Sequence, residues 1–275
     1  MAKKILVNAN QLVTCSGFSA KKGNDMKELH IIEDGAVIIE GDLITGVGTT
    51  AELLPKARDA EVIDCSGKAV LPGFVDSHTH FIFGGYRADE FSWRLSGVPY
   101  MEIMKRGGGI NATTLPTRAA SLDDLKEDGR RRLSSMLAFG VTTVEGKSGY
   151  GLDLETEIKQ LTAMKELDEE LPIDIVSTFM GAHSVPGEYK GRTDEYVNFV
   201  IDKVIPAVAG QNLAEFCDVF CEAGVFDIEQ SRRILEAAKN YGMKIKLHAD
   251  EIVPFGGAEL AAELGAVSAD HLLQV

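Results

Sequence analysis

From residue 69 onward, short apolar runs alternate with longer segments in which apolar residues have helical spacing. The strand-like runs lie at 69–75, 141–145, 173–179, 217–221, 244–247 and 267–273. The helical patterns lie at 121–139, 154–169, 193–207, 228–241 and 257–264. Strands and helices that alternate in this way form a parallel α/β sheet, either open and doubly wound or closed as a (β/α)8 barrel. No GxGxxG follows the first strand, which argues against a dinucleotide-binding sheet.

The first 68 residues have a different pattern. Strand-like runs at 4–9, 36–40, 43–47 and 61–64 are separated by turn signals such as Asp34-Gly35. We therefore expect two domains: a small N-terminal β domain over 1–68, and the α/β domain over 69–275.

Composition limits the partners and the compartment. The formal net charge is −14 and no basic patch is evident, which argues against nucleic acid and anionic membranes as partners. No segment has the length and hydrophobicity of a signal peptide core or a membrane span. The four cysteines form no CxxC pair, so neither a disulfide framework nor a thiolate zinc site is expected, and a reduced cytoplasmic location fits.

Histidines occur at or just beyond the ends of the predicted strands. His78 and His80 follow the first strand, His183 the third and His248 the fifth, while His271 lies in the sixth. The carboxyl ends of parallel barrel strands open onto one face, where barrel enzymes carry their chemistry, and this favours the barrel. An HxH pair by itself is equally compatible with two polar residues in a loop, but the convergence of five histidines favours a metal site.

Residues i and i+2 of a strand point to the same side, so His78 and His80 can bind one divalent cation together with His248. Such a cation acidifies water and makes it a nucleophile at neutral pH. Glu251, three residues beyond His248, is placed to act as general acid; the alternative is a solvated loop carboxylate.

Several motifs resemble a known family. Residues 70–80, VLPGFVDSHTH, resemble the first-strand motif of the metal-dependent amidohydrolase superfamily, whose members of the urease-like type carry a β domain before the barrel. Within that superfamily, five further segments resemble the imidazolonepropionase family: 79–91, 107–110, 145–152, 181–183 and 246–251. Gly107-Gly108-Gly109 also reads as a mobile loop or lid.

The resemblance implies a (β/α)8 amidohydrolase barrel with a small N-terminal β-sandwich-type domain. It implies hydrolysis of the lactam ring of 4-imidazolone-5-propanoate to N-formimidoyl-L-glutamate in histidine degradation, by a homodimer that holds zinc or iron. By the family pattern, the metal ligands are His78, His80 and His248. Substrate contacts are assigned to Arg87, Tyr150, His183 and Glu251, where the Arg87 guanidinium suits the propanoate carboxylate.

Catalytic roles also follow from the resemblance. His183 is expected to polarise the ring carbonyl and stabilise the oxyanion. Glu251 is expected to shuttle protons, and His271 to orient the water or support the ligands.

The family pattern has one further metal ligand, an aspartate after the eighth barrel strand, whereas six strands are predicted here. Asp270 stands in the sixth strand and cannot be given that role by motif. We therefore expect an incomplete barrel, belonging either to a C-terminally shortened enzyme or to a natural fragment. Low independent stability and little activity are expected of residues 1–275 alone, because a parallel barrel normally leaves no sheet edge open.

Two other functions remain compatible with the sequence. A related amidohydrolase that deaminates a nucleobase-like ring would use the same histidines. A catalytically incompetent fragment would bind metal weakly or act only in assembly.

Overall fold

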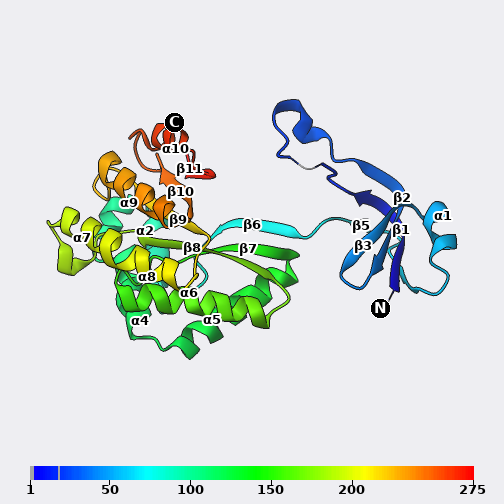
Figure 1. The fold of residues 1–275 in the computed structure, drawn as a ribbon, viewed down its shortest axis with the longest axis horizontal. Coiled ribbons are helices and arrows are strands. Elements are labelled where there is room, and N and C mark those ends of the chain that lie inside the picture. The colour runs from blue at the N-terminus through cyan, green and yellow to red at the C-terminus, as the bar shows by residue number, and fades with distance from the viewer. Residues whose placement is uncertain (1–2, 18) are drawn as a thin grey trace. The chain divides into compact units, whose positions relative to one another are not determined.

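The structure is a computed structural model that describes residues 3–17 and 19–275. The chain divides into two compact units, Met1–Gly73 and Phe74–Val275, and each is described by itself (Figure 1).

The first unit is built on a five-stranded mixed sheet. The strands are β1 (Lys3–Val13), β2 (Ile31–Glu40), β3 (Leu43–Thr49), β4 (Glu61–Asp64) and β5 (Ala69–Val70). Their order is β3-β2-β1-β4, with β5 also pairing with β1. The chain reverses between β1, β2 and β3, while β4 and β5 run parallel to β1. The α-helix α1 (Thr50–Leu53) begins with a capping box of Thr49 and Glu52, and its Leu53 packs into the small core beside Ile5.

The predicted strand over 69–75 is wrong, because the structure divides this run between the two units. Ala69–Val70 is β5 and pairs with β1, whereas β6 (Phe74–Thr79) is the first strand of the second unit. Pro72 has no N–H to donate to a sheet ladder and Gly73 weakens a strand, so pairing stops between the two pieces. His78 therefore lies within β6 rather than beyond it, and His80 follows directly.

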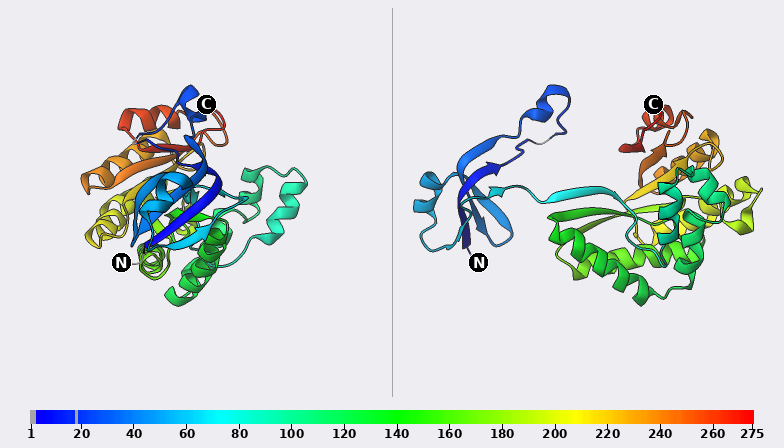
Figure 2. Two further views of the ribbon diagram at one scale, coloured as in Figure 1. Left: turned by 90° about the vertical axis from the view of Figure 1, so that its right-hand side faces the viewer. Right: turned by 180° about the vertical axis from the view of Figure 1, so that it is seen from behind.

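The second unit contains six parallel strands in the order β11-β10-β9-β8-β7-β6. After β6 come β7 (Val141–Lys147), β8 (Asp174–Ala182), β9 (Phe216–Cys221), β10 (Lys244–Ala249) and β11 (Ser268–His271). Every strand pairs with its neighbour in sequence, and the sheet forms a nearly closed barrel with helices outside it (Figures 1 and 2). The predicted α/β barrel with six strands is confirmed.

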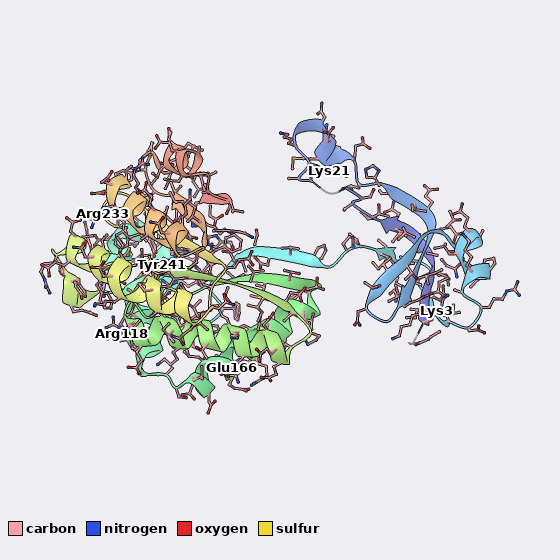
Figure 3. The ribbon with its side chains drawn as sticks, in the orientation of Figure 1. Lys3, Lys21, Arg118, Glu166, Arg233 and Tyr241 are labelled. Carbon is pink, nitrogen blue, oxygen red and sulfur yellow. The ribbon has the colours of Figure 1, made fainter. Side chains whose placement is uncertain are left out.

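Along the chain, the barrel helices alternate with the barrel strands. They are α5 (Leu122–Ala138), α6 (Leu154–Glu170), α7 (Thr193–Phe199), α8 (Ile205–Gly210), α9 (Ile228–Asn240) and α10 (Gly257–Leu264). The predicted helix 193–207 is interrupted by a π-helical turn at Val200–Val204, just before Pro206 removes a backbone donor. Charged side chains on the outer surface join neighbouring helices: Glu166 of α6, which is labelled in Figure 3, lies 2.6 Å from Lys126 of α5.

Three helices between β6 and α5 were not predicted: α2 (Ala88–Leu95), α3 (Tyr100–Lys105) and α4 (Ile110–Ala119). The glycines read as a mobile loop join α3 to α4. Gly109 has φ of +66° and its N–H donates to the buried carboxylate of Glu90 at 2.8 Å. Pro116, which lies inside α4, masks the helical pattern in the sequence.

Within the part of the chain that the structure describes, none of the helices combines the length and the apolar character that crossing a membrane requires.

Candidate active site

A cavity of about 210 Å³ lies at the carboxyl ends of the barrel strands. All eight residues that the sequence predicted for the site line it: His78, His80, Arg87, Tyr150, His183, His248, Glu251 and His271. Four residues that were not predicted complete the lining: Arg94, Tyr100, Ile110 and Phe220. Arg94 and Tyr100 were not predicted because they lie on helices α2 and α3, and neither helix was recognised from the spacing of apolar residues in the sequence.

The five histidines of the cavity form one cluster. The ring centroids of His78 and His248 are 4.6 Å apart. The ring centroid of His80 lies 5.8 Å from that of His78 and 5.9 Å from that of His248. Three sets of side chains have ligand atoms within 4.8 Å of one another: His78/His248/His271, His80/His183/His248, and Asp218/His248/Asp270. The predicted triad His78/His80/His248 is not itself such a set among the described residues, although His248 belongs to all three.

The protonation states of these imidazoles suit a cation. Burial and the neighbouring imidazole of His248 lower the pKa of His183 to about 3. The same two causes, with His78, lower the pKa of His271 to about 4. Burial and the surrounding histidines also hold the pKa of His80 well below its usual value. Neutral imidazoles offer nitrogen lone pairs, so the donor set fits a divalent metal ion such as zinc or iron.

A buried charge network lies beside the histidines. The Lys147 ammonium is fully buried and lies 2.8 Å from Glu145, 2.7 Å from Asp218 and 3.1 Å from Asp270. Lys246 lies 2.6 Å from the other oxygen of Glu145. The sequence analysis did not single out Asp218, although a carboxylate in the apolar run 216–221 was a usable signal.

This network connects directly to two candidate ligands. Asp218 Oδ2 lies 3.0 Å from Nδ1 of His248, and Asp270 Oδ2 lies 2.9 Å from Nδ1 of His78. Asp270 makes a hydrogen bond to Nδ1 of His78, which leaves Nε2 of that ring as the ligand atom, the usual arrangement behind a metal-binding histidine. Asp218 lies close to Nδ1 of His248 but without the alignment of a hydrogen bond. Asp270, which motif alone could not assign, thus supports His78.

A second group of cavity residues can bind an anion. Arg87 presents a buried Nη1 with no hydrogen-bond partner in the described part of the chain. An unsatisfied buried guanidinium N–H is costly, and a substrate carboxylate would satisfy it. Tyr150 and Tyr100 line the same cavity, and burial raises the pKa of both phenols, which keeps their O–H groups available as donors.

Glu251 and His271 form a candidate proton-transfer pair. Glu251 Oε2 lies 3.4 Å from His271 Nε2, and both line the cavity. Burial raises the pKa of Glu251 above its ordinary value, which favours a carboxyl group that carries a proton nearer neutral pH.

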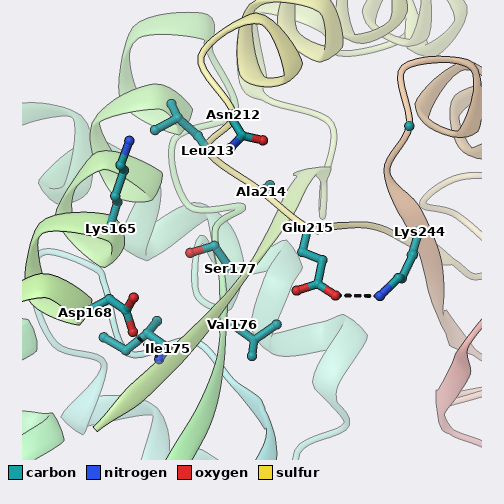
Figure 4. Close-up of a pocket in the computed structure, with 11 residues that line it drawn as sticks. Lys165, Asp168, Ile175, Val176, Ser177, Asn212, Leu213, Ala214, Glu215 and Lys244 are labelled. Carbon is teal, nitrogen blue, oxygen red and sulfur yellow. Dashed lines mark hydrogen bonds and ion pairs between the residues drawn. The ribbon is translucent and has the colours of Figure 1, made fainter. Parts of the chain in front are cut away.

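A larger cavity of about 470 Å³ lies at the amino-terminal ends of β8 and β10, away from the histidines (Figure 4). Its lining contains the Glu215–Lys244 ion pair at 2.6 Å and no histidine. Because barrel enzymes work at the opposite ends of their strands, we place no chemistry here.

Comparisons with known proteins agree with this picture. The model of the amidohydrolase family matches residues 61–114. The chain is 60% identical to an imidazolonepropionase of Clostridium tetani over 98% of its own length and 65% of the relative's. It is 55% identical to an imidazolonepropionase of Bacteroides thetaiotaomicron over 100% of its length and 67% of the relative's. The chain thus spans about two thirds of these relatives.

Among solved structures, a triazine hydrolase from Arthobacter aurescens matches with a TM-score of 0.59 at 16% identity, over 96% of this chain and 56% of that one. Likeness at this identity concerns the fold alone, and it agrees with the amidohydrolase barrel.

Proposed function

Because the chain belongs to the imidazolonepropionase family of the amidohydrolase superfamily, we propose that it carries the site for hydrolysis of 4-imidazolone-5-propanoate. Water opens the lactam C–N bond of the ring, and N-formimidoyl-L-glutamate is formed. The observation that carries the proposal is the cavity that combines a cluster of neutral imidazoles with the guanidinium of Arg87, whose buried Nη1 has no hydrogen-bond partner among the described residues.

The imidazoles are the proposed metal ligands. We assign His78, His80 and His248 to one zinc or iron ion. Asp270 lies beside the ring of His78 and Asp218 beside the ring of His248. When bound, the ion supplies a nucleophile at neutral pH by lowering the pKa of water to about 7.

The remaining residues bind the substrate and move protons. Arg87 pairs with the propanoate carboxylate and Tyr150 donates a hydrogen bond beside it, while His183 contacts the ring. Glu251 delivers a proton to the ring nitrogen that leaves, and the carboxyl pKa raised by burial supports this role. His271, 3.4 Å from Glu251, orients that carboxyl group.

The proposal is tested by turnover. The assay compares the 275-residue chain with a chimaera in which it is joined to the part of the Clostridium tetani relative that the sequence match leaves uncovered, and follows formation of N-formimidoyl-L-glutamate. We expect a metal-loaded chimaera to be active. Ring opening by neither protein, with metal bound, would refute the proposal.

The substitution Arg87→Ala tests substrate class. Loss of one charge-assisted contact of about 1.5–3 kcal/mol should raise KM for imidazolonepropanoate about 10- to 100-fold. The matched control is Arg106→Ala, since Arg106 is exposed and its 3.4 Å contact with Glu102 lies outside the cavity. A deaminase acting on a neutral nucleobase-like ring would be indifferent to Arg87→Ala, and ammonia release from such a ring identifies it.

Assembly is a further part of the proposal. We expect a homodimer, as the family resemblance implies, and analytical ultracentrifugation measures it.

A further inference from the structure

Two imidazoles of the cavity are held by the backbone of one loop, residues 148–152, which joins β7 to α6. The carbonyl oxygen of Ser148 lies 3.2 Å from Nδ1 of His80. The carbonyl oxygen of the next residue, Gly149, lies 3.1 Å from Nδ1 of His183. A carbonyl oxygen only accepts hydrogen bonds, so both Nδ1 atoms carry the hydrogen. In the neutral rings Nε2 then has none.

The two rings lie against each other in a single arrangement. Their centroids are 4.6 Å apart and their planes differ by 9°. Both Nε2 atoms consequently act as lone-pair donors, toward a cation or toward a substrate N–H. This changes the role expected of His183: a neutral His183 bound to Gly149 accepts at Nε2 and cannot donate there to a developing oxyanion.

The loop is in turn held by two side chains of helix α6. Glu157 Oε2 accepts from the N–H of Gly149 at 3.0 Å, and its Oε1 accepts from the N–H groups of Gly151 and Leu152 at 2.9 and 2.8 Å. Gln160, three residues on and thus on the same helix face, accepts from the N–H of Tyr150 at 3.3 Å. Glu157 is 1% exposed and Gln160 is fully buried, so water does not compete for these bonds.

The close approach of the loop depends on Gly149. A Cβ at this position would lie 2.6 Å from the carbonyl oxygen of Met180 and 2.8 Å from Cβ of His183, and its φ is +99°. The backbone therefore meets the His183 ring directly, and any shift of Gly149 is passed to that ring.

We propose that Glu157 is a positioning residue: by receiving three N–H groups of the 149–152 loop, it fixes the carbonyls that hold His80 and His183 as Nδ1–H tautomers. One carboxylate outside the cavity thus determines which ring nitrogen carries the hydrogen in two histidines inside it. The same carboxylate also fixes the backbone of Tyr150, which lies between Gly149 and Gly151. The tautomers rest on these hydrogen bonds and not on the proposed substrate, so each proposal can fail while the other stands.

The first experiment uses the unmutated protein. Two-bond ¹H–¹⁵N correlation spectra of the histidine rings at neutral pH distinguish Nδ1–H from Nε2–H. We expect Nδ1–H for His80 and His183, both in metal-free protein and with one equivalent of Zn²⁺. An Nε2–H signal from either ring would overturn the proposal, and this result does not depend on a variant that folds.

The second experiment compares Glu157→Gln with Glu166→Gln. In the first variant an amide NH₂ faces the N–H of Gly149, donor against donor, while the other two bonds can remain. Glu166 lies on the same helix and forms an ion pair with Lys126 of α5. The readouts are the ring spectra, Zn²⁺ affinity by chelator competition, and thermal unfolding.

For Glu157→Gln we expect a second tautomer of His80 and of His183. Because His80 is one of the proposed metal ligands, we also expect about 10- to 100-fold weaker Zn²⁺ binding, the usual effect of disturbing the support of a ligand histidine. For Glu166→Gln we expect unchanged ring spectra and Zn²⁺ affinity within twofold. Ring spectra and Zn²⁺ affinity that stay unchanged in folded Glu157→Gln would overturn the positioning role.

Discussion

Substitution of the buried Lys147 tests whether the charge network beside the candidate site also stabilises the barrel. Lys147→Met keeps the length of the side chain and removes its charge. The three carboxylates around it lie at 2.8, 2.7 and 3.1 Å, and Lys246 is the second ammonium of the network. Three carboxylates against two ammonium groups have a formal charge of −1, and the substitution makes it −2.

The expected loss of stability follows from burial. Removing one partner of a buried ion pair costs about 3–5 kcal/mol, because the other partner stays desolvated without compensation. Lys147 and Asp218 are both fully buried, so this range applies, and it is a large part of the 5–15 kcal/mol that stabilises a typical domain. If the free energy of unfolding depends on urea concentration as it does in other small proteins, the urea concentration at the unfolding midpoint should fall by about 1–3 M.

Trp93, the only tryptophan of the chain, lies on α2 and reports on the second unit by fluorescence during urea unfolding. The matched control is Lys126→Met, which breaks a single, more exposed ion pair with Glu166 at 2.6 Å and should cost no more than about 1 kcal/mol. The double variant Lys147→Met/Asp218→Asn should recover part of the loss, because it removes one unbalanced carboxylate. A midpoint for Lys147→Met no lower than that of the control would refute the reasoning.

Three further predictions concern protons and metal. Glu251→Gln should lower kcat about 10²- to 10⁴-fold with little change in substrate affinity, as measured by steady-state kinetics; a fall confined to KM would exclude the general-acid role. In metal-free protein, the pKa of His183 lies near 3 instead of 6.5, so the unfolded chain takes up a proton below pH 6.5 that the folded chain does not. Stability from this residue is therefore complete above pH 6.5 and is lost as pH falls toward 3, by about 1.4 kcal/mol per pH unit; urea unfolding of His183→Asn should show a flatter dependence between pH 4 and 6. Elemental analysis should find one zinc or iron per chain, and chelation should lower the thermal midpoint, since an ion that binds only the folded state stabilises it; a chain without metal and indifferent to chelator would support the incompetent-fragment alternative.

The barrel and most of its site could be predicted from sequence because both depend on local patterns. An apolar run followed by His78 and His80 indicates the carboxyl end of a strand. His183 and His248 likewise mark the carboxyl ends of later strands. Parallel topology then places the ends of these strands together without knowledge of any contact. The predicted strand 69–75 failed for the complementary reason: periodicity shows that a segment is extended but not which sheet it joins.

Tertiary structure alone decided which groups touch. Lys147 and Asp218 are 71 residues apart and share a 2.7 Å ion pair that no spacing rule predicts. The hydrogens on His80 and His183 were assigned by carbonyl oxygens of a loop that Glu157 holds from a neighbouring helix. The sequence by itself determined that the histidines at the strand ends reach one cavity, because the carboxyl ends of parallel strands share one face. Arg94 and Tyr100 of the lining came only from the fold. Their charge state, tautomer and partners came from the fold, because burial and hydrogen-bond geometry exist only once distant segments have packed together.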